Sequence, residues 1–122
     1  MILLKRAYDH AAHADGERFL VERLWPRGIK KSALPLEGWL KDIAPSTELR
    51  KWFNHDPAKW KQFQRRYRAE LRTSPQLCEP LVRKAQRGTI TLVYSSHDVD
   101  HNNAVVLKEF LEEKLHPHAK AA

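Results

Sequence analysis

The stretch TITLVYSSHD, residues 89–98, decides the fold because it holds a strand and the polar loop that follows it. Residues 89–94 are β-branched, aromatic or apolar, which is typical of a strand buried inside a sheet. Gly88 stands just before them, where a preceding helix would stop. Two more strands are predicted upstream, from Ile2 to Tyr8 and from Arg18 to Leu24, the second with side chains that alternate between two faces.

Helical segments separate the second predicted strand from the third, and one more follows the third. Two short helices are expected, from Pro35 to Ile43 and, after a Ser46 cap, from Thr47 to Phe53. Two longer ones follow, from Asp56-Pro57 to about Arg72 and from Ser74-Pro75 to about Gln86, the latter with an interruption at Pro80. The last runs from Asn103 to Leu115. Strands that alternate with helices favour an α/β fold. We therefore expect a small single domain of that class, with a central, mostly parallel sheet, a block of helices between strands two and three, and a C-terminal helix.

The lengths of the connections predict how the strands run. The link between the first two strands is short, and length alone favours a hairpin, because a parallel crossover usually needs about a dozen residues. The link from the second strand to the third is long enough for a parallel crossover. If those two strands are parallel neighbours, the polar residues that follow each of them meet on one rim of the sheet.

The composition limits the class of protein. With 122 residues the chain fits one domain, which we place at residues 1–115, with a flexible tail at residues 116–122. A net charge of +7 favours anionic partners such as nucleic acid, nucleotides or phosphorylated metabolites, although the same charge also serves solubility. The lone Cys78 excludes a disulfide framework and cysteine-rich zinc modules. This cysteine usage, the short apolar start and the lack of a run of about 20 apolar residues predict a cytoplasmic protein with no membrane partner.

Two polar clusters at strand ends form the candidate ligand site, which is expected to take an anionic, phosphate-bearing small molecule. The residues expected to bind it are Arg23, Trp25, Arg27, Ser95, His97, His101, Asn102 and, from a helix junction, His55. Arginine offers paired donors to phosphate or carboxylate, tryptophan a flat face, and the start of the last helix unpaired N–H groups. The plainer alternative is that Pro26 and Gly28 only turn the chain and Trp25 belongs to the core. A buried Arg23 would then need a carboxylate partner such as Asp98.

The sequence assigns no catalytic residue, metal or cofactor. Ser95, His97 and Asp98 have the residue types of a hydrolase triad, but groups this close in sequence rarely face one another, and a Gly-x-Ser-x-Gly elbow is absent. The loop between His97 and His101 argues against a shared metal ion. A P-loop and a glycine-rich dinucleotide fingerprint are also absent, so a nucleotide cofactor bound by either device is not expected. Whether the protein is an enzyme stays open.

A basic helix face supports an alternative function. The helix that begins near Asp56 carries on one face Lys61, Arg65, Arg68 and Arg72. Several phosphate contacts from such a face would give salt-sensitive binding to DNA or RNA. An ordinary solvated helix face is the plainer interpretation of the same residues. A third alternative is an interaction domain whose basic surface meets an acidic protein, and the oligomeric state is not predicted.

The chain resembles the YeaO-like family, a branch of a large family of uncharacterised bacterial domains. The resemblance lies in VERLWPRGIKK (residues 21–31), in APSTELRKWFNHDPAKW (residues 44–60) with RYRAEL after it, and in TLVYSSHDVDHNNAVVLKEFL (residues 91–111). It spans residues 2–115. The positions that match the family signature are Arg23, Trp25, Pro26, Arg27, Gly28, Trp39, Ser46, Arg50, Trp52, His55, Asp56, Pro57, Tyr67, His101 and Asn102.

The resemblance implies a small cytosolic α/β fold whose first two strands are parallel, in place of the hairpin that length alone favours. It implies no activity, and a methyltransferase label carried by some members is not supported here, because the glycine-rich loop is missing. Asn54 stands where the pattern usually has glycine, and both residues tolerate a positive φ. Glu22 and the run at residues 95–97 also depart from the pattern, and His97 would bind an anion only when protonated.

Overall fold

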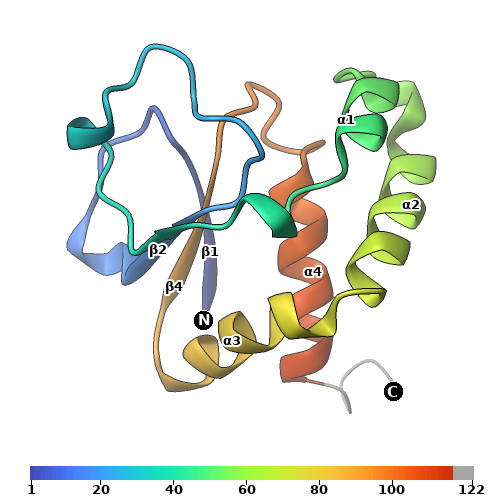
Figure 1. The fold of residues 1–122 in the computed structure, drawn as a ribbon. Helices are drawn as coiled ribbons and strands as arrows, with labels where there is room; N and C mark the ends of the chain where they lie inside the picture. Colours follow the sequence, from blue (N-terminus) through green and yellow to red (C-terminus); the bar gives the residue numbers. More distant parts are fainter. Residues whose placement is uncertain (117–122) are drawn as a thin grey trace.

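The computed structural model describes residues 1–116 and shows a parallel sheet with helices packed against one face (Figure 1). The strands are β1 (Ile2–Arg6), β2 (Glu17–Leu20), β3 (Gly38–Trp39) and β4 (Ile90–Tyr94), in the spatial order β1-β4-β2-β3. Every pair of neighbouring strands is parallel. The predicted α/β class with a central parallel sheet is confirmed.

Strand β4 lies inside the sheet and pairs on both edges, with β1 on one side and β2 on the other. Leu92 sits opposite Leu4 of β1 and opposite Phe19 of β2. Every residue of β4 is buried, as its β-branched and apolar composition predicts. The two ladders of this strand therefore hold the sheet together.

The first two strands are parallel, as the resemblance implies, and the hairpin expected from their spacing is wrong. They do not pair with each other, because β4 lies between them. Their connection, residues 7–16, holds only a short 3-10 turn at His13–Asp15 and no helix. The two strands cannot pair with each other as a hairpin because β4 lies between them and pairs with the facing edge of each.

Gly16 allows this connection to enter β2. Its φ is +63°, in the left-handed region, and a Cβ placed there would lie 2.0 Å from the carbonyl oxygen of Thr89. The next residue, Glu17, donates its backbone N–H to that same oxygen at 3.3 Å. The start of the β2–β4 ladder therefore requires a residue without a side chain.

The helices are α1 (Thr47–Phe53), α2 (Trp60–Arg72), α3 (Pro75–Arg87) and α4 (Asn103–Leu115). Ser46 caps α1 by accepting the N–H of Leu49, as predicted. Ser74 does not cap α3 with its side chain, although Pro75 takes the expected first position. Pro80 lies inside a continuous α3, so the predicted interruption is wrong. Proline has no N–H and removes one backbone hydrogen bond, and the helix continues past it.

The helix predicted from Pro35 to Ile43 is also wrong. This segment is extended at β3 and then forms a 3-10 turn at Lys41–Ile43. The open edge of β2 supplies the reason, because Glu37 donates its N–H to Arg18 at 2.7 Å and Leu40 donates its N–H to Leu20 at 2.8 Å. Gly38 weakens any helix there. Sheet pairing therefore replaces the weak helical preference of the segment.

The sheet has two unlike faces. The helices cover one face and share a large core with it, which includes Phe19, Val21 and Leu92. The other face is covered by the irregular segment 21–37 together with Trp39, and Leu20 and Val93 are buried there. Strand β2 ends at Leu20 rather than at the predicted Leu24, because the chain leaves the ladder there to cross this second face. Figure 1 shows α1, α2 and α4 together on one side of the strands.

The predicted flexible tail, residues 116–122, lies outside the described residues except for His116, which follows α4. Among residues 1–116, no helix has the length and apolar character needed to cross a membrane.

Substitution at two glycines will test how far the fold depends on the close contact between Gly16, just before β2, and Thr89. We expect Gly16→Ala to lower the free energy of unfolding by at least about 2 kcal/mol, since the new Cβ clashes with Thr89 and the φ is left-handed. Gly28→Ala is the matched control: its φ is +77° but a Cβ would meet nothing within 4 Å, so the loss should be only about 1 kcal/mol. Urea unfolding measures both. Equal losses would show that the contact with Thr89 is unimportant.

Candidate functional site

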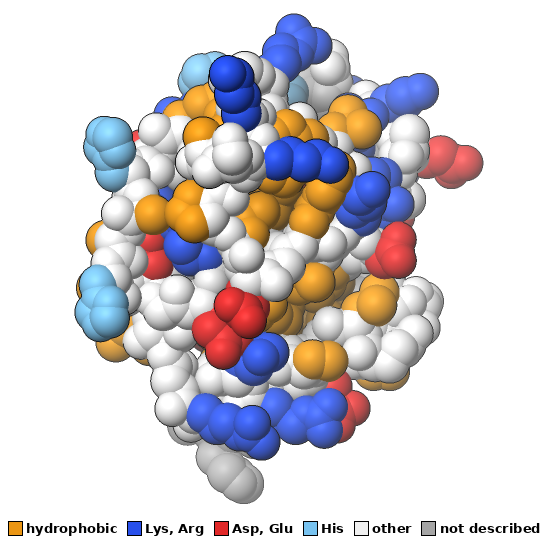
Figure 2. Space-filling model, turned by 60° about the vertical axis from the view of Figure 1, so that its left-hand side comes forward, with side chains coloured by type: hydrophobic (Ala, Val, Ile, Leu, Met, Phe, Trp, Pro, Cys, Tyr) orange, Lys and Arg blue, Asp and Glu red, His pale blue; other side chains and the backbone are white. Residues whose placement is uncertain are grey.

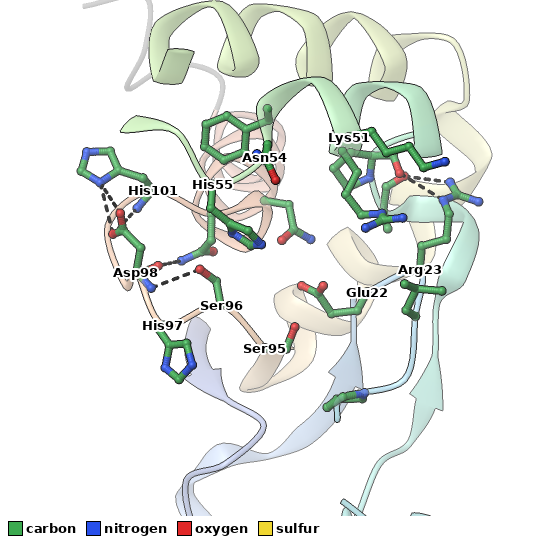
Figure 3. A pocket seen from close by; sticks show the side chains of 18 of the residues that line it. Glu22, Arg23, Lys51, Asn54, His55, Ser95, Ser96, His97, Asp98 and His101 are labelled. Carbon is green, nitrogen blue, oxygen red and sulfur yellow. Dashed lines mark hydrogen bonds and ion pairs between the residues drawn. The ribbon is translucent and has the colours of Figure 1, made fainter. Parts of the chain in front are cut away.

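A cavity of about 610 Å³ opens at the carboxyl ends of β2 and β4. Its walls come from the segment after β2, the end of α1 with the turn that follows, and the segment from the end of β4 into α4. The lining residues include Glu22, Arg23, Arg27, Arg50, Lys51, Asn54, His55, Ser95, His97, Asp98, His101 and Asn103. Figure 3 shows the side chains of these walls directed toward a common space.

The sheet topology creates this cavity. Strands β2 and β4 are parallel neighbours, with Leu20 opposite Val93, so both chains leave the sheet at the same edge. After β2 the chain crosses the face covered by residues 21–37, whereas after β4 it enters α4 on the helical face. A crevice forms where neighbouring strands send their connections to opposite faces, and ligands of open α/β sheets bind at such points.

All the residues predicted as ligand-binding line this cavity: Arg23, Trp25, Arg27, His55, Ser95, His97, His101 and Asn102. They do not all lie together. Figure 3 shows Asp98 and His101 at one end of the cavity and Arg23 with Lys51 at the other. The predicted single cluster is therefore divided, with Arg23 and His101 at opposite ends of the cavity.

Arg23 is held by backbone carbonyls and not by the carboxylate suggested from the sequence. Its Nε donates to the oxygen of Pro45 at 3.1 Å, and its Nη2 donates to the oxygen of Ala44 at 3.1 Å. These two bonds tie the segment after β2 to the segment before α1. The guanidinium keeps its full charge at the edge of the cavity, because carbonyl acceptors carry no opposing charge.

Trp25 and Asn102 are largely engaged within the protein. The indole N–H of Trp25 donates to the carbonyl of Ile29 at 2.6 Å, and its ring packs edge-on against Trp39 at 5.3 Å. Asn102 is 3% exposed, caps α4 by accepting the N–H of Val105, and donates to Asp98. Both side chains shape the walls of the cavity and have few groups left for a ligand.

The two histidines of the β4–α4 segment are held by charged neighbours. Nη2 of Arg6 lies 3.2 Å from Nδ1 of His97, and since arginine only donates, the ring accepts there and carries its proton on Nε2. Nδ1 of His101 lies 2.9 Å from Oδ2 of Asp98, and the ring packs edge-on against Trp60. The backbone N–H of Asp100 is the main reason that the pKa of Asp98 lies below its usual value, and His101 adds to it.

The turn after α1 carries two consecutive left-handed residues, Asn54 with φ 46° and His55 with φ 56°. The positive φ of Asn54 is the one inferred from its place in the family pattern. A left-handed histidine is uncommon and costs about 1 kcal/mol or more, and such strain gathers at functional sites. The turn places both residues on the wall of the cavity.

Glu22 also lines the cavity, although it is not among the ligand-binding residues predicted from the sequence. Its Oε1 is buried and has no hydrogen-bond partner among residues 1–116. Burial raises the pKa of this carboxyl to about 7, while Ser95, Asn103 and the charge of Arg50 lower it by less. Figure 3 shows the carboxylate directed into the cavity on the side of Ser95.

The backbone around Glu22 is fixed on every side. Val21 donates its N–H to Val93 at 3.0 Å and accepts the amide of Asn103 at 2.7 Å. The carbonyl of Glu22 accepts the indole N–H of Trp39 at 2.6 Å. A firmly positioned carboxyl with one unpaired oxygen, Oε1, is available to a ligand. An acidic residue directly after a buried strand, in the run Val21-Glu22-Arg23, is the signal that would have pointed to it.

The basic face predicted on α2 is partly neutralised. Arg68 forms ion pairs with Glu113 and, at 3.5 Å, with Glu109 of α4. The remaining members of the face are exposed: Lys61, Arg65 and Arg72. The nucleic-acid alternative therefore rests on three side chains rather than the four chosen from the sequence.

Figure 2 shows one face of the molecule where Lys and Arg surround a hollow with hydrophobic side chains at its floor.

Among residues 1–116, no group of three or more His, Cys, Asp and Glu side chains is placed to hold a metal ion. The side chains that line the cavity offer guanidinium, ammonium, imidazole, hydroxyl and amide groups and the carboxyl groups of Glu22 and Asp98. The cationic groups can bind anions, and the others can bind hydrogen-bonding ligands.

Fold and site together define a small parallel α/β domain with a polar cavity at the carboxyl edge of its sheet. The chain belongs to the family DUF488-N3i, described as the inactive DUF488-N3 subclade, whose model matches residues 1–122. It is 46% identical over 110 residues to the uncharacterized protein YeaO of Escherichia coli strain K12, covering 90% of this chain and 96% of that protein. It is 38% identical over 110 residues to the uncharacterized protein Rv3073c of Mycobacterium tuberculosis strain H37Rv, covering 90% and 92%. No solved structure matched the chain. These matches confirm the resemblance to the YeaO-like family.

The buried carboxyl of Glu22 should make stability depend on pH. Its pKa of about 7 lies above the ordinary value of 4.5, so the folded state binds more protons between these values, and stability falls as the pH rises through that window. Glutamine does not ionise, so the free energy of unfolding of Glu22→Gln should not fall in this way. We expect it to rise relative to that of the wild type by roughly 1 to 3 kcal/mol between pH 4.5 and pH 8. Urea unfolding at a series of pH values measures the difference. The other ionisable groups that line the cavity are the same in both proteins, so a difference that stays flat with pH would contradict the assignment to Glu22.

Proposed function

We propose that this protein binds a small phosphorylated or otherwise anionic compound in the cavity at the carboxyl edge of its sheet. The observation that carries the proposal is the set of cationic side chains left without a carboxylate partner on the cavity wall. Among residues 1–116, no hydrogen bond or ion pair holds the side chains of Arg27, Arg50 and Lys51, all of which are exposed there.

The position of the cavity supports the same proposal. Parallel sheets bind ligands beyond the carboxyl ends of their strands, and this cavity lies between two strands whose connections diverge. A volume of about 610 Å³ is in the range of small-molecule sites and is far larger than one inorganic anion. Apolar walls from Pro26, Pro45 and Phe53 leave room for a less polar part of the ligand.

Binding without chemistry is favoured over catalysis. The family is described as an inactive subclade, which speaks for a domain that recognises a ligand and does not transform it. The hydrolase residue types at positions 95–98 are used locally, since the Ser96 hydroxyl accepts the N–H of Asp98 and Asp98 holds His101. Ser96 and His101 are therefore each bonded to Asp98 and are not paired with each other as nucleophile and base.

Phosphate-induced stabilisation tests the proposal. We expect inorganic phosphate to raise the melting temperature of the wild type in a saturable way, because a ligand that binds only the folded state stabilises it. Arg27→Ala and Lys51→Ala should each weaken phosphate binding by about tenfold, since a charge-assisted bond contributes about 1.5 kcal/mol or more.

The matched control is Arg83→Ala, which removes the same charge from α3, where Arg83 pairs only loosely with Glu79 at 3.8 Å. It should bind phosphate as the wild type does. Saturable stabilisation by phosphate that Arg27→Ala and Lys51→Ala leave unchanged, or no stabilisation of the wild type at any phosphate concentration, would refute the proposed site.

A further inference from the structure

We infer that Glu22 recognises a neutral hydrogen-bond donor, a hydroxyl or an N–H group, on the same ligand whose anionic group the cationic side chains hold. The ligand class is therefore a phosphate ester that carries a free hydroxyl or N–H on its non-anionic part. This inference rests on the proposed function and adds the second recognition element of the cavity.

The first support is the unpaired oxygen. Oε1 of Glu22 is removed from solvent and has no partner within residues 1–116. A buried polar atom without a hydrogen bond costs about 1 to 3 kcal/mol, so folded proteins seldom retain one without a use. The carboxylate is directed into the cavity beside Ser95, so a ligand in the cavity can supply the missing partner.

The second support is the distribution of charge. Glu22 is an acid among cations, because Arg23, Arg50 and Lys51 also line the cavity. An anion held by these cations would be repelled by an ionised Glu22 unless another group of the ligand satisfied that carboxyl. A donor group on the ligand does so, and it also restores the hydrogen bond that Oε1 lacks.

The donor is neutral rather than an ammonium group. The cations of the cavity would repel a second positive charge, while they leave a hydroxyl or N–H group unaffected. Burial also favours the protonated form of Glu22 near neutral pH, and a protonated carboxyl pairs well with a hydroxyl that both donates and accepts. A sugar phosphate or a phosphorylated heterocycle has this chemistry.

Three probes separate the roles of the anion and of the donor: inorganic phosphate, phenyl phosphate, whose ring carries no donor, and ribose 5-phosphate, whose ring carries hydroxyls. We expect the wild type to bind ribose 5-phosphate at least about tenfold more tightly than phenyl phosphate, measured by isothermal titration calorimetry. Glu22→Met, which removes the polar atoms and nearly keeps the volume, should reduce that preference to within about threefold. Its affinity for phenyl phosphate should stay or rise.

Two further variants complete the design. Glu22→Gln keeps one acceptor oxygen and should keep part of the preference, which a purely structural role would not predict. Glu48→Gln makes the same charge change at an exposed position of α1 outside the cavity and should leave all three affinities unchanged. The melting temperature of each variant confirms that it is folded.

The outcomes distinguish the two proposals. Failure of every phosphate probe to bind the wild type overturns the proposed function and this inference with it. Binding of all probes without a preference for ribose 5-phosphate, or an equal loss for all probes in Glu22→Met, leaves the anion site standing and overturns the role of Glu22. O-phosphoethanolamine is added as a fourth probe that carries an ammonium group. Preferential binding of this probe that Glu22→Met abolishes overturns the neutral donor, because it shows recognition of an ammonium group.

Discussion

The parallel ladder between β2 and β4 is the interaction on which the rest of the structure depends. Its residues are separated by about seventy positions in sequence, and its closure alone brings the segment after Leu20 beside the segment after Tyr94. The glycine before β2 permits the ladder to start, and the amide of Asn103 secures its far end to Val21. The cavity, its cations and its buried carboxyl are all consequences of that one pairing.

The cavity combines groups that would oppose each other without a ligand. Cationic side chains on α1 and after β2 attract an anion, whereas Glu22 resists one when it is ionised. The structure relieves this conflict partly by burial, which raises the pKa of the carboxyl to about 7 and so favours its protonated form below that pH. Under the proposed function, a ligand that presents an anion and a donor at the correct separation would relieve it fully. Selectivity would then come from the distance between two groups of the ligand rather than from the strength of either.

Features that depend on neighbouring residues in the sequence could be predicted, and features that depend on contacts between distant segments could not. Ser46 and the Asp56-Pro57 pair specify helix starts through bonds made within a few residues, so α1 and the approach to α2 were evident. The adjacency of two strand ends followed from a general rule of parallel sheets. In contrast, β3 is only two residues long and exists because β2 has a free edge, which no periodicity records. The burial of Glu22 and the carbonyl partners of Arg23 likewise depend on distant segments.

The unlike covering of the two sheet faces has a consequence for how a ligand is received. One wall of the cavity begins at a capped helix packed into the main core, and such a wall keeps its shape. The opposite wall belongs to a long irregular segment that is held by side-chain bonds to backbone carbonyls, such as those of Arg23 and Trp25, rather than by a ladder. Its exposed side chains, such as Leu24 and Arg27, can change without disturbing the helical core. Diversity of ligand preference among relatives would accumulate there, on a scaffold that stays the same.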